Sequence, residues 1–258
     1  MGHLLTPLPD GSTTLTETSQ GQAMHSKLGA WREATEVYVT PSRIAESTGP
    51  VVLWDVGMGT AANAVAAIEG SACPLDIWSF ENDLDGLRTA ITHSHLFPWI
   101  GRHLGLLEQL LENRSVALPG GRGAWHLLEG DFRRTQHQAT EPDLVFWDFY
   151  SPSVVPDLWN CDVFRILSGR LKPHALWLSY AAATPVRAAL LLAGFYVSRG
   201  PSTAAKSETT QASLNPLSPK LGTEWLGKID RSSRPLPYGY LGNRESLKQE
   251  LLSSPNFS

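Results

Sequence analysis

The segment Val51–Asn63, VVLWDVGMGTAAN, constrains the fold of this chain more than any other stretch. An apolar run ends at Asp55, the glycines Gly57 and Gly59 follow, and Thr60 begins a pattern typical of a helix. Glycines let the backbone pass close to a ligand, and the first turn of the next helix presents free N–H groups to it. The order strand, glycine turn, helix is typical of a nucleotide-type cofactor site in an α/β sheet.

Strand-like and helix-like segments alternate along the chain after this motif. The predicted strands are residues 51–56, 75–80, 124–128, 144–147, 175–180 and 195–198, and the predicted helices are residues 60–69, 84–94, 104–113, 161–171 and 186–193. Such alternation predicts an α/β fold with a mostly parallel sheet and helices on both faces.

The chain is expected to form one core domain over residues 49–258, preceded by an N-terminal extension over residues 1–48. A tight turn followed by a short strand, and a helix near residues 30–39, predict that this extension is a hairpin and a helix that pack on the core. Residues 201–219 are rich in Ser, Thr, Ala and Pro, which predicts a mobile loop.

Acidic residues follow four of the predicted strands directly or within a few residues: Asp55, Glu81, Asp131 and Asp148. The carboxyl ends of parallel strands meet at one edge of a sheet, and ligands of such sheets bind beyond that edge. The sequence therefore predicts one acidic site built from successive strands.

The acid before the glycine turn separates two classes of cofactor. A carboxylate at Asp55 would repel a pyrophosphate but would attract the ammonium of S-adenosyl-L-methionine. Glu81 suits either class, because a carboxylate after the second strand can accept hydrogen bonds from ribose hydroxyls. Ala62 completes a looser G-x-G-x-x-A pattern, so a nicotinamide dinucleotide stays open as the alternative. The pattern favours S-adenosyl-L-methionine.

The later acids suggest separate roles. Asp131 is expected either near the adenine, where it would accept from the exocyclic amine, or as the N-cap of the following helix. Asp148 opens the segment DFYSP and is the candidate catalytic residue. Its carboxylate would orient an amine and take its proton, which an alkylamine in water keeps up to pH ~10. A simple turn at the end of the strand is the alternative interpretation.

Aromatic residues after Asp148 are candidates for binding the substrate. Phe149 and Tyr150 are expected to pack on a planar substrate, with Tyr150 also a candidate catalytic residue, and Trp159 is expected to form a pocket wall. The pair His25 and Ser26 favours a helix cap over catalysis.

Composition excludes several classes of protein. The two cysteines, Cys73 and Cys161, have no metal-like spacing and indicate a reducing, cytoplasmic location; the sequence predicts no metal site. The N-terminus lacks the features of a signal peptide, and no apolar run is long enough to span a membrane. The net charge of −4 argues against a general nucleic-acid binder, although residues 187–258 hold 9 Lys/Arg and 5 Asp/Glu.

Several segments together resemble the MnmC-like methyltransferase family. They are DGSTTL at 10–15, MHSKLGAWREATEVYV at 24–39, DVGMGTAAN at 55–63, EGDFR at 129–133, DLVFWDFYSPSVVPDLWNCDVF at 143–164 and AGFYVSRGP at 193–201. The best-known member is the methyltransferase half of the bifunctional enzyme that completes 5-methylaminomethyl-2-thiouridine at the wobble position of tRNA. The resemblance covers residues 10–235, roughly.

The resemblance implies a class I S-adenosyl-L-methionine-dependent methyltransferase fold and methyl transfer to an aminomethyl group in the tRNA anticodon loop. By the same resemblance, Asp148 is the active-site acid, and Gly57, Gly59, Glu81 and Asp131 line the cofactor. Lys206 is expected to contact substrate, although the loop around it has few of the family's glycines. The chain is similar to stand-alone members, without an oxidoreductase half. A small-molecule N- or O-methyltransferase and a non-catalytic cofactor-binding subunit remain alternatives.

Overall fold

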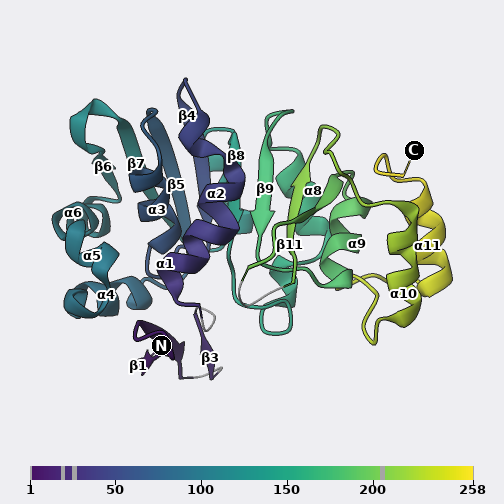
Figure 1. Cartoon of the computed structure of the whole chain (residues 1–258), viewed down its shortest axis with the longest axis horizontal. Helices are drawn as coiled ribbons and strands as arrows, with labels where there is room; N and C mark the ends of the chain where they lie inside the picture. The colour runs from purple at the N-terminus through teal and green to yellow at the C-terminus, as the bar shows by residue number, and fades with distance from the viewer. Residues whose placement is uncertain (1, 19–20, 25–27, 204–206, 258) are drawn as a thin grey trace.

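The computed structural model describes residues 2–18, 21–24, 28–203 and 207–257. Its main body is an eight-stranded sheet with helices on both faces (Figure 1). The strand order is β10-β11-β9-β8-β4-β5-β7-β6. The strands are β4 (Val51–Val56), β5 (Leu75–Glu81), β6 (Ser115–Ala117), β7 (Gly123–Glu129), β8 (Leu144–Trp147), β9 (Leu176–Ser179), β10 (Tyr196–Gly200) and β11 (Thr209–Ser213).

Five neighbouring strands of this sheet, β9, β8, β4, β5 and β7, are parallel. The chain runs from β4 to β5 on one side and later returns to β8 on the other side of β4. The gap between the ends of β4 and β8 is therefore the topological switch point, where open α/β sheets bind their ligands. The predicted α/β fold with a mostly parallel sheet is confirmed.

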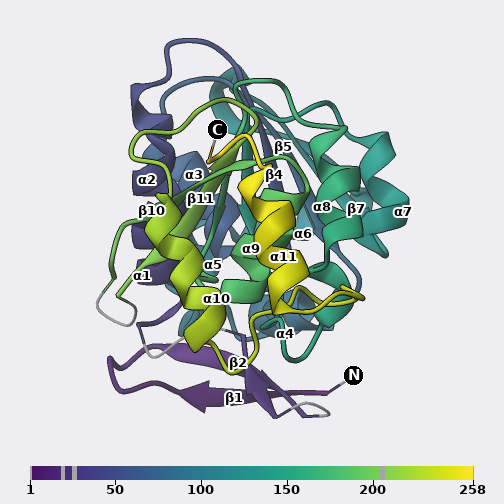
Figure 2. The ribbon, with the colours of Figure 1, turned by 90° about the vertical axis from the view of Figure 1, so that its right-hand side faces the viewer.

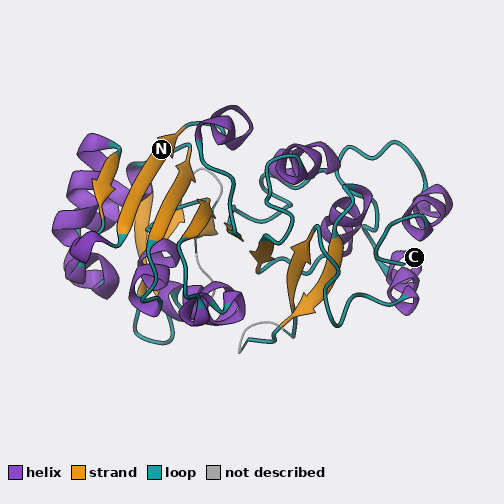
Figure 3. Ribbon diagram, turned by 90° about the horizontal axis from the view of Figure 1, so that it is seen from above, coloured by secondary structure: helices purple, strands orange, loops and turns teal. Residues whose placement is uncertain are grey.

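Helices cover the two faces of the sheet, as the view from above shows (Figure 3). One face packs against α1 (Ala30–Glu33), the π-helix η1 (Ala34–Val39), α3 (Ala62–Gly70), α4 (Asp85–Thr92), α5 (Pro98–Arg102) and α6 (Leu104–Asn113). The other face packs against α7 (Phe132–Thr135), α8 (Cys161–Ser168), α9 (Thr184–Leu192), α10 (Gly227–Arg231) and α11 (Arg244–Leu252). Short helices α2 (Thr40–Ser42), η2 (Ile44–Glu46), η3 (Ser94–Leu96), η4 (Pro119–Gly121), η5 (Gln136–Gln138), η6 (Pro156–Leu158) and η7 (Thr223–Leu226) complete the described structure.

Burial on both faces explains why the strands are apolar throughout. In β4, Leu53 belongs to one core cluster and Trp54 and Val56 to the other. Parallel strands covered on both sides are near-continuous apolar runs, so they lack the alternation that would show which way each residue points.

A small antiparallel sheet, β1 (His3–Pro7), β2 (Thr13–Glu17) and β3 (Gln22–Ala23), lies apart from the large one. Two views at right angles place it below the main body (Figures 1 and 2). Residues of α1 and η1, by contrast, lie inside the main core. The domain boundary near residue 48 stays a prediction.

The prediction of a mobile loop over residues 201–219 is wrong for Thr209–Ser213, which form β11. This strand lies between β9 and β10 and is antiparallel to both. Its sequence, TTQAS, has little apolar content, so composition alone indicated a loop. Two neighbouring strands supply its hydrogen bonds, and four of its five residues are buried. Tertiary context has outweighed the local signal.

Candidate active site

A cavity of about 420 Å³ opens at the switch point, where β4, β5 and β8 end. The loops after these three strands form one side of it. The small N-terminal sheet contributes His3 and Glu17 to the lining, and Met24 follows directly after that sheet. Six of the sequence-predicted site residues line this cavity: Gly57, Gly59, Glu81, Asp148, Phe149 and Tyr150.

Gly57 lets the glycine turn lie directly against the loop after β8. Its φ is +87°, and a Cβ at this position would lie only 2.7 Å from the carbonyl oxygen of Asp148. Any side chain would therefore push the two loops apart. The close approach joins the glycine turn to the segment that carries Asp148, whose own N–H donates to the Val56 carbonyl at 2.8 Å.

Glu81 links the second strand to the glycine turn. Its Oε2 accepts a hydrogen bond from the Gly59 N–H at 3.0 Å, while Oε1 accepts from the N–H groups of Asn82 and Asp83. A carboxylate offers about four acceptor positions. Oε2 therefore keeps one free acceptor position, which suits one ribose hydroxyl. Oε1 already accepts two hydrogen bonds, so the two oxygens are not both open to the two ribose hydroxyls. Burial raises the pKa of Glu81, and the three backbone hydrogen bonds oppose that shift.

Asp55 lies beneath the glycine turn and lines neither cavity described here. It is fully buried, and its Oδ2 accepts a hydrogen bond from the Ser79 hydroxyl at 2.8 Å, while Oδ1 has no hydrogen-bond partner in the part of the chain that the structure describes. Burial, with the nearby charge of Glu81, raises the pKa of Asp55 to about 7. This position does not allow the direct attraction between the Asp55 carboxylate and a cofactor ammonium that the sequence predicted. The glycine turn separates the Asp55 side chain from the cavity, so Asp55 has no direct contact with the cavity.

Asp148 projects into the cavity with both carboxylate oxygens held. The Tyr38 hydroxyl donates to Oδ1 at 2.8 Å, and the Asn63 side-chain amide donates to Oδ2 at 2.8 Å. Burial, reinforced by the negative charge of Glu33, raises the pKa of Asp148 to about 7, although the two hydrogen bonds act in the opposite direction. A carboxyl group with such a pKa can exchange a proton near neutral pH.

The aromatic residues after Asp148 have different surroundings. Phe149 lines the cavity and packs edge-to-face on Trp147, with ring centroids 5.2 Å apart. The Tyr150 hydroxyl is buried at the cavity without a hydrogen-bond partner among the described residues, and burial raises its pKa. A hydroxyl in this state is available to a ligand.

Trp159 does not form the pocket wall that the sequence suggested. It is fully buried in the core, and its indole N–H donates to the Tyr150 carbonyl at 3.0 Å. Because a large aromatic ring gains most from complete burial, the side chain anchors the loop that carries Tyr150 and offers no surface to a substrate.

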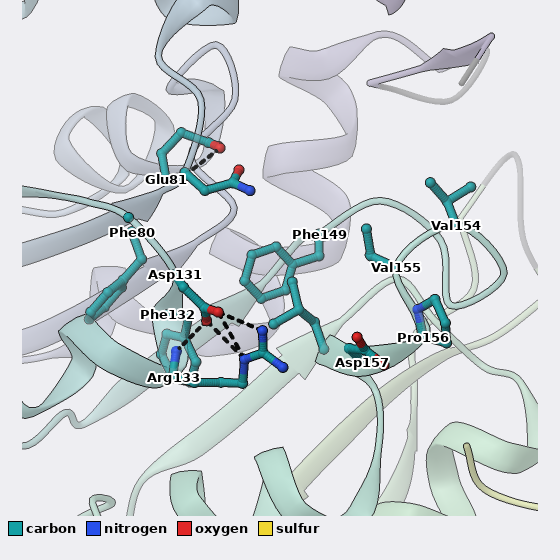
Figure 4. Close-up of a pocket in the computed structure, with 13 residues that line it drawn as sticks. Phe80, Glu81, Asp131, Phe132, Arg133, Phe149, Val154, Val155, Pro156 and Asp157 are labelled. Carbon is teal, nitrogen blue, oxygen red and sulfur yellow. Dashed lines mark hydrogen bonds and ion pairs between the residues drawn. The ribbon is translucent and has the colours of Figure 1, made fainter. Parts of the chain in front are cut away.

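A second compartment of about 270 Å³ adjoins the first and shares Glu81, Phe149 and Val155 with it (Figure 4). Asp131 lies here with Arg133, whose backbone N–H and guanidinium both donate to its carboxylate. These hydrogen bonds hold the pKa of Asp131 below its ordinary value. Asp131 is the N-cap of α7, so one of its two expected roles is confirmed. Contact with an adenine amine stays a prediction, and would compete with Arg133.

The charge of the larger compartment is strongly negative. Its described lining includes the carboxylates of Glu17, Glu81, Asp83 and Asp148, and neither Lys nor Arg occurs among these lining residues. A cation fits such a space, whereas a pyrophosphate would be repelled. The residues present therefore fit the sulfonium and ammonium groups of S-adenosyl-L-methionine better than the pyrophosphate of a dinucleotide.

Sequence analysis missed several residues of the site. Tyr38 and Asn63 contact Asp148 from segments 110 and 85 residues away, and spacing along the chain cannot show such contacts. His3 and Glu17 come from the small sheet, and neither lies in a segment that the sequence analysis singled out. The candidates Lys206, His25 and Ser26 lie outside the described residues.

Among the residues that the structure describes, no group of three or more His, Cys, Asp or Glu side chains is arranged to hold a metal ion. None of the described helices has the length and apolar character needed to cross a membrane. The cysteines Cys73 and Cys161 are both buried and unpaired.

Comparisons with known proteins agree with this geometry. Residues 104–215 match a family model described as S-adenosyl-L-methionine-dependent methyltransferase. The solved structure of MNMC2 from Aquifex aeolicus superposes with a TM-score of 0.76 at 28% identity, covering 97% of this chain and 84% of that one.

Curated sequences show the same relationship. An uncharacterized protein of Methanocaldococcus jannaschii is 28% identical over 221 residues, covering 83% of this chain and 60% of its own length. The tRNA 5-methylaminomethyl-2-thiouridine biosynthesis bifunctional protein MnmC of Burkholderia vietnamiensis is 26% identical over 211 residues, covering 75% of this chain. The chain spans only 32% of that bifunctional relative.

These findings confirm the predicted resemblance, the class I fold and S-adenosyl-L-methionine as the cofactor. The acidic cleft at the switch point agrees with the site that the acids at the strand ends predicted. The chain therefore has the fold of a class I S-adenosyl-L-methionine-dependent methyltransferase, and most of its length is similar to the methyltransferase half of MnmC.

Proposed function

We propose that this enzyme methylates the primary amine of a 5-aminomethyl-uridine at the wobble position of tRNA. The observation that carries the proposal is Asp148, a cavity-lining carboxyl group whose pKa is raised to about 7. An alkylamine must lose its proton before its lone pair can attack, and in water it keeps that proton up to pH ~10. A general base poised near neutral pH suits an amine acceptor.

In the proposed reaction, each side chain of the site has a separate role. The bound cofactor supplies a methyl group on a positively charged sulfur, and this leaving group needs no further activation. Asp148 accepts a hydrogen bond from the ammonium of the substrate and takes one proton, so that a neutral amine faces the methyl group. Phe149 packs against the uracil ring, and the Tyr150 hydroxyl donates to a polar atom of the base. Holding the reacting groups in line can contribute ~7–11 kcal/mol to lowering the barrier.

The cofactor would occupy both compartments. Glu81 would hold one ribose hydroxyl through Oε2, and the adenine would enter the smaller compartment beside Asp131. Gly57 and Gly59 keep the glycine turn close enough for backbone contact. These assignments follow from the lining of the two compartments and from the free acceptor position on Glu81.

The tRNA itself would approach from the edge of the sheet where β10 ends. Arg199 and Lys228 lie near that edge, around Glu208, with side chains 51% and 40% exposed. With Lys206, they are the cations expected to follow the phosphates of the anticodon loop, in a salt-sensitive way. A tRNA substrate also implies that the enzyme works in the cytoplasm.

A decisive experiment uses S-adenosyl-L-methionine with a labelled methyl group and tRNA that carries unmethylated 5-aminomethyl-uridine. The tRNA is digested after incubation, and its nucleosides are separated by mass spectrometry. The proposal predicts labelled 5-methylaminomethyl-uridine. Label in another nucleoside would disprove the assigned acceptor, and absence of label in all nucleosides would disprove tRNA as the substrate.

One observation favours a second candidate, a small-molecule N-methyltransferase. The carboxylates that line the cavity would repel the phosphates of a polynucleotide but would attract a small free amine. A panel of primary amines in the same assay separates the two candidates. Turnover on an amine but not on tRNA would select the small-molecule enzyme, and any turnover excludes a non-catalytic subunit.

A further inference from the structure

Tyr38, to which the sequence analysis assigned no role, contacts Asp148 directly. Its ring is fully buried and packs on Phe146, with ring centroids 5.3 Å apart. Its hydroxyl lies 2.8 Å from Asp148 Oδ1 and 3.2 Å from the carbonyl oxygen of Trp147. Burial and the charge of Asp148 both raise the pKa of Tyr38, so the hydroxyl keeps its proton and remains a donor.

The backbone that presents Tyr38 is unusual. Residues Ala34–Val39 form a π-helix between α1 and α2. Hydrogen bonds from i to i+5 place more residues in each turn than an α-helix does, and this changes the direction in which later residues point. Such segments are rare and are found frequently at functional sites. Here the segment ends one residue after Tyr38.

Asn63 holds the other oxygen of the same carboxylate. It lies in the first turn of α3, is 5% exposed and donates from Nδ2 to Asp148 Oδ2 at 2.8 Å. The amide and the hydroxyl are neutral donors, so they fix the carboxylate in space without cancelling its charge. Each oxygen accepts one of these hydrogen bonds and has capacity for a further one.

We propose that Tyr38 and Asn63 are positioning residues that clamp Asp148 in the orientation from which it accepts a proton from the substrate. This inference rests on the proposed role of Asp148 as the base. It assigns neither residue any contact with the reacting atoms. Both residues act through Asp148 alone, one from the π-helix and the other from the helix after the glycine turn.

Several titratable groups surround Asp148 and bear on the test. They are Glu33 on α1, Tyr38 on η1, Asp55 on β4 and Tyr180 after β9. Glu33 and Asp55 are negative and raise the pKa of Asp148, whereas the hydrogen bonds from Tyr38 and Asn63 lower it. Removal of either hydrogen bond should therefore raise the pH at which Asp148 loses its proton.

The test compares the variants Tyr38→Phe and Asn63→Ala with the wild-type enzyme and with Asp148→Asn. Tyr38→Phe keeps the ring against Phe146 and removes only the hydroxyl. We expect kcat at pH 7 to fall roughly 10-fold in each clamp variant, because a hydrogen bond to a charged group is lost. The KM for S-adenosyl-L-methionine should stay within about twofold, and the acidic limb of the kcat profile should move up by roughly one pH unit.

A second readout does not depend on the substrate. The Asp148 carboxyl is followed by ¹³C NMR in protein with labelled aspartate, and its signal is identified by its loss in Asp148→Asn. We expect its titration midpoint to rise in both clamp variants. Tyr240→Phe is the matched control, because it removes a hydroxyl that donates to Glu250 in the C-terminal region. It should behave as the wild type, with thermal unfolding confirming that all variants fold.

The outcomes separate this inference from the proposed function. Suppose that both clamp variants keep the wild-type kcat and the wild-type titration midpoint of Asp148, while Asp148→Asn loses turnover. The clamp is then disproved, and the role of Asp148 as the base is still supported. If Asp148→Asn keeps its turnover, the assignment of Asp148 as the base is disproved. The titration midpoint from NMR then decides alone whether Tyr38 and Asn63 hold the carboxylate. A loss of kcat in Tyr240→Phe equal to that in Tyr38→Phe would also overturn the clamp.

Discussion

The cleft around Asp148 and the cluster around Glu208 both bury charged side chains, but they compensate that burial differently. In the cleft, Asp55 and Asp148 accept hydrogen bonds from neutral donors, and burial raises the pKa of each to about 7. In the Glu208 cluster, which consists of Arg187, Arg199, Lys228 and Glu208, opposite charges meet directly.

Arg187 shows how completely the second region is compensated. Its side chain is 0% exposed, and its guanidinium donates to Glu208, to the Thr209 carbonyl and to the Thr210 hydroxyl. Burial acts to raise the pKa of Glu208, but Lys228 and Arg187 outweigh it, and the pKa falls below the ordinary value. The ion pairs of Glu208 hold β11 in place. In the cleft, where Asp148 accepts hydrogen bonds from neutral donors, the raised pKa allows its carboxyl group to exchange a proton near neutral pH.

The largest predicted effect tests the cleft. Asp148→Asn keeps the shape of the side chain and removes the base, so kcat should fall by roughly 10²- to 10⁴-fold. Binding of S-adenosylhomocysteine, measured by calorimetry, should change by less than about threefold. Turnover close to that of the wild type would show that the raised pKa of Asp148 has no catalytic meaning.

The next effect tests the Glu208 cluster. Arg187→Met leaves Glu208 and the polar atoms of β11 without their buried partner, which should cost about 3–5 kcal/mol of unfolding free energy. Urea denaturation measures the loss. A cost below about 1 kcal/mol would show that the cluster contributes no more than a surface ion pair.

The pH dependence of stability should have opposite signs in the two regions. The folded-state pKa of Asp55 is raised to about 7 from 3.8, so its contribution is present below pH ~4 and is lost as the pH rises to 7. Asp55→Asn should therefore gain stability relative to the wild type over that range. The pKa of Glu208 is lowered from 4.5, so its contribution is present above that value and is lost in acid.

Glu208→Gln should accordingly be most destabilised near neutral pH, and its deficit should shrink as the pH falls below about 4.5. Urea unfolding of both variants and of the wild type, from pH 4 to pH 7.5, measures the two slopes. Slopes of the same sign would refute the contrast between the two regions.

The smallest effect is expected at the rim of the Glu208 cluster. The Lys228 side chain is 40% exposed, and its ammonium lies 2.9 Å from Glu208. Exposed ion pairs contribute about 0–1 kcal/mol, so Lys228→Met should lower the unfolding free energy by less than about 1 kcal/mol. A loss as large as that of Arg187→Met would mean that burial of the partner does not decide the strength of the pair.

The sequence predicted the order of elements well because local signals carry it. The apolar strands, the glycine turn and the helices with 3.6-residue periodicity were all visible in the chain. It failed at β11, where polar residues form a strand only because β9 and β10 flank them. It also failed at Trp159, because an aromatic residue after a catalytic loop can face either the core or the cavity.

The candidate site was predicted in part. Glu81 and Asp148 line the cavity, as acids after parallel strands should. Asp55 shares this pattern but lies under the glycine turn, on the same face of β4 as Leu53, because residues i and i+2 of a strand point the same way. The two-residue periodicity of a strand could have indicated which way Asp55 points. A strand that is buried on both faces is apolar throughout, however, and does not show this periodicity in its sequence.

By itself, then, the sequence determined which chemical groups are present and at which strand ends they stand, because short-range periodicity and turn chemistry are written locally. Only the tertiary structure decided which carboxylates face the ligand, which are buried behind it, and that Tyr38 and Asn63 hold Asp148. Contacts between residues 85 and 110 positions apart depend on how helices pack on the sheet, and no local pattern encodes that packing.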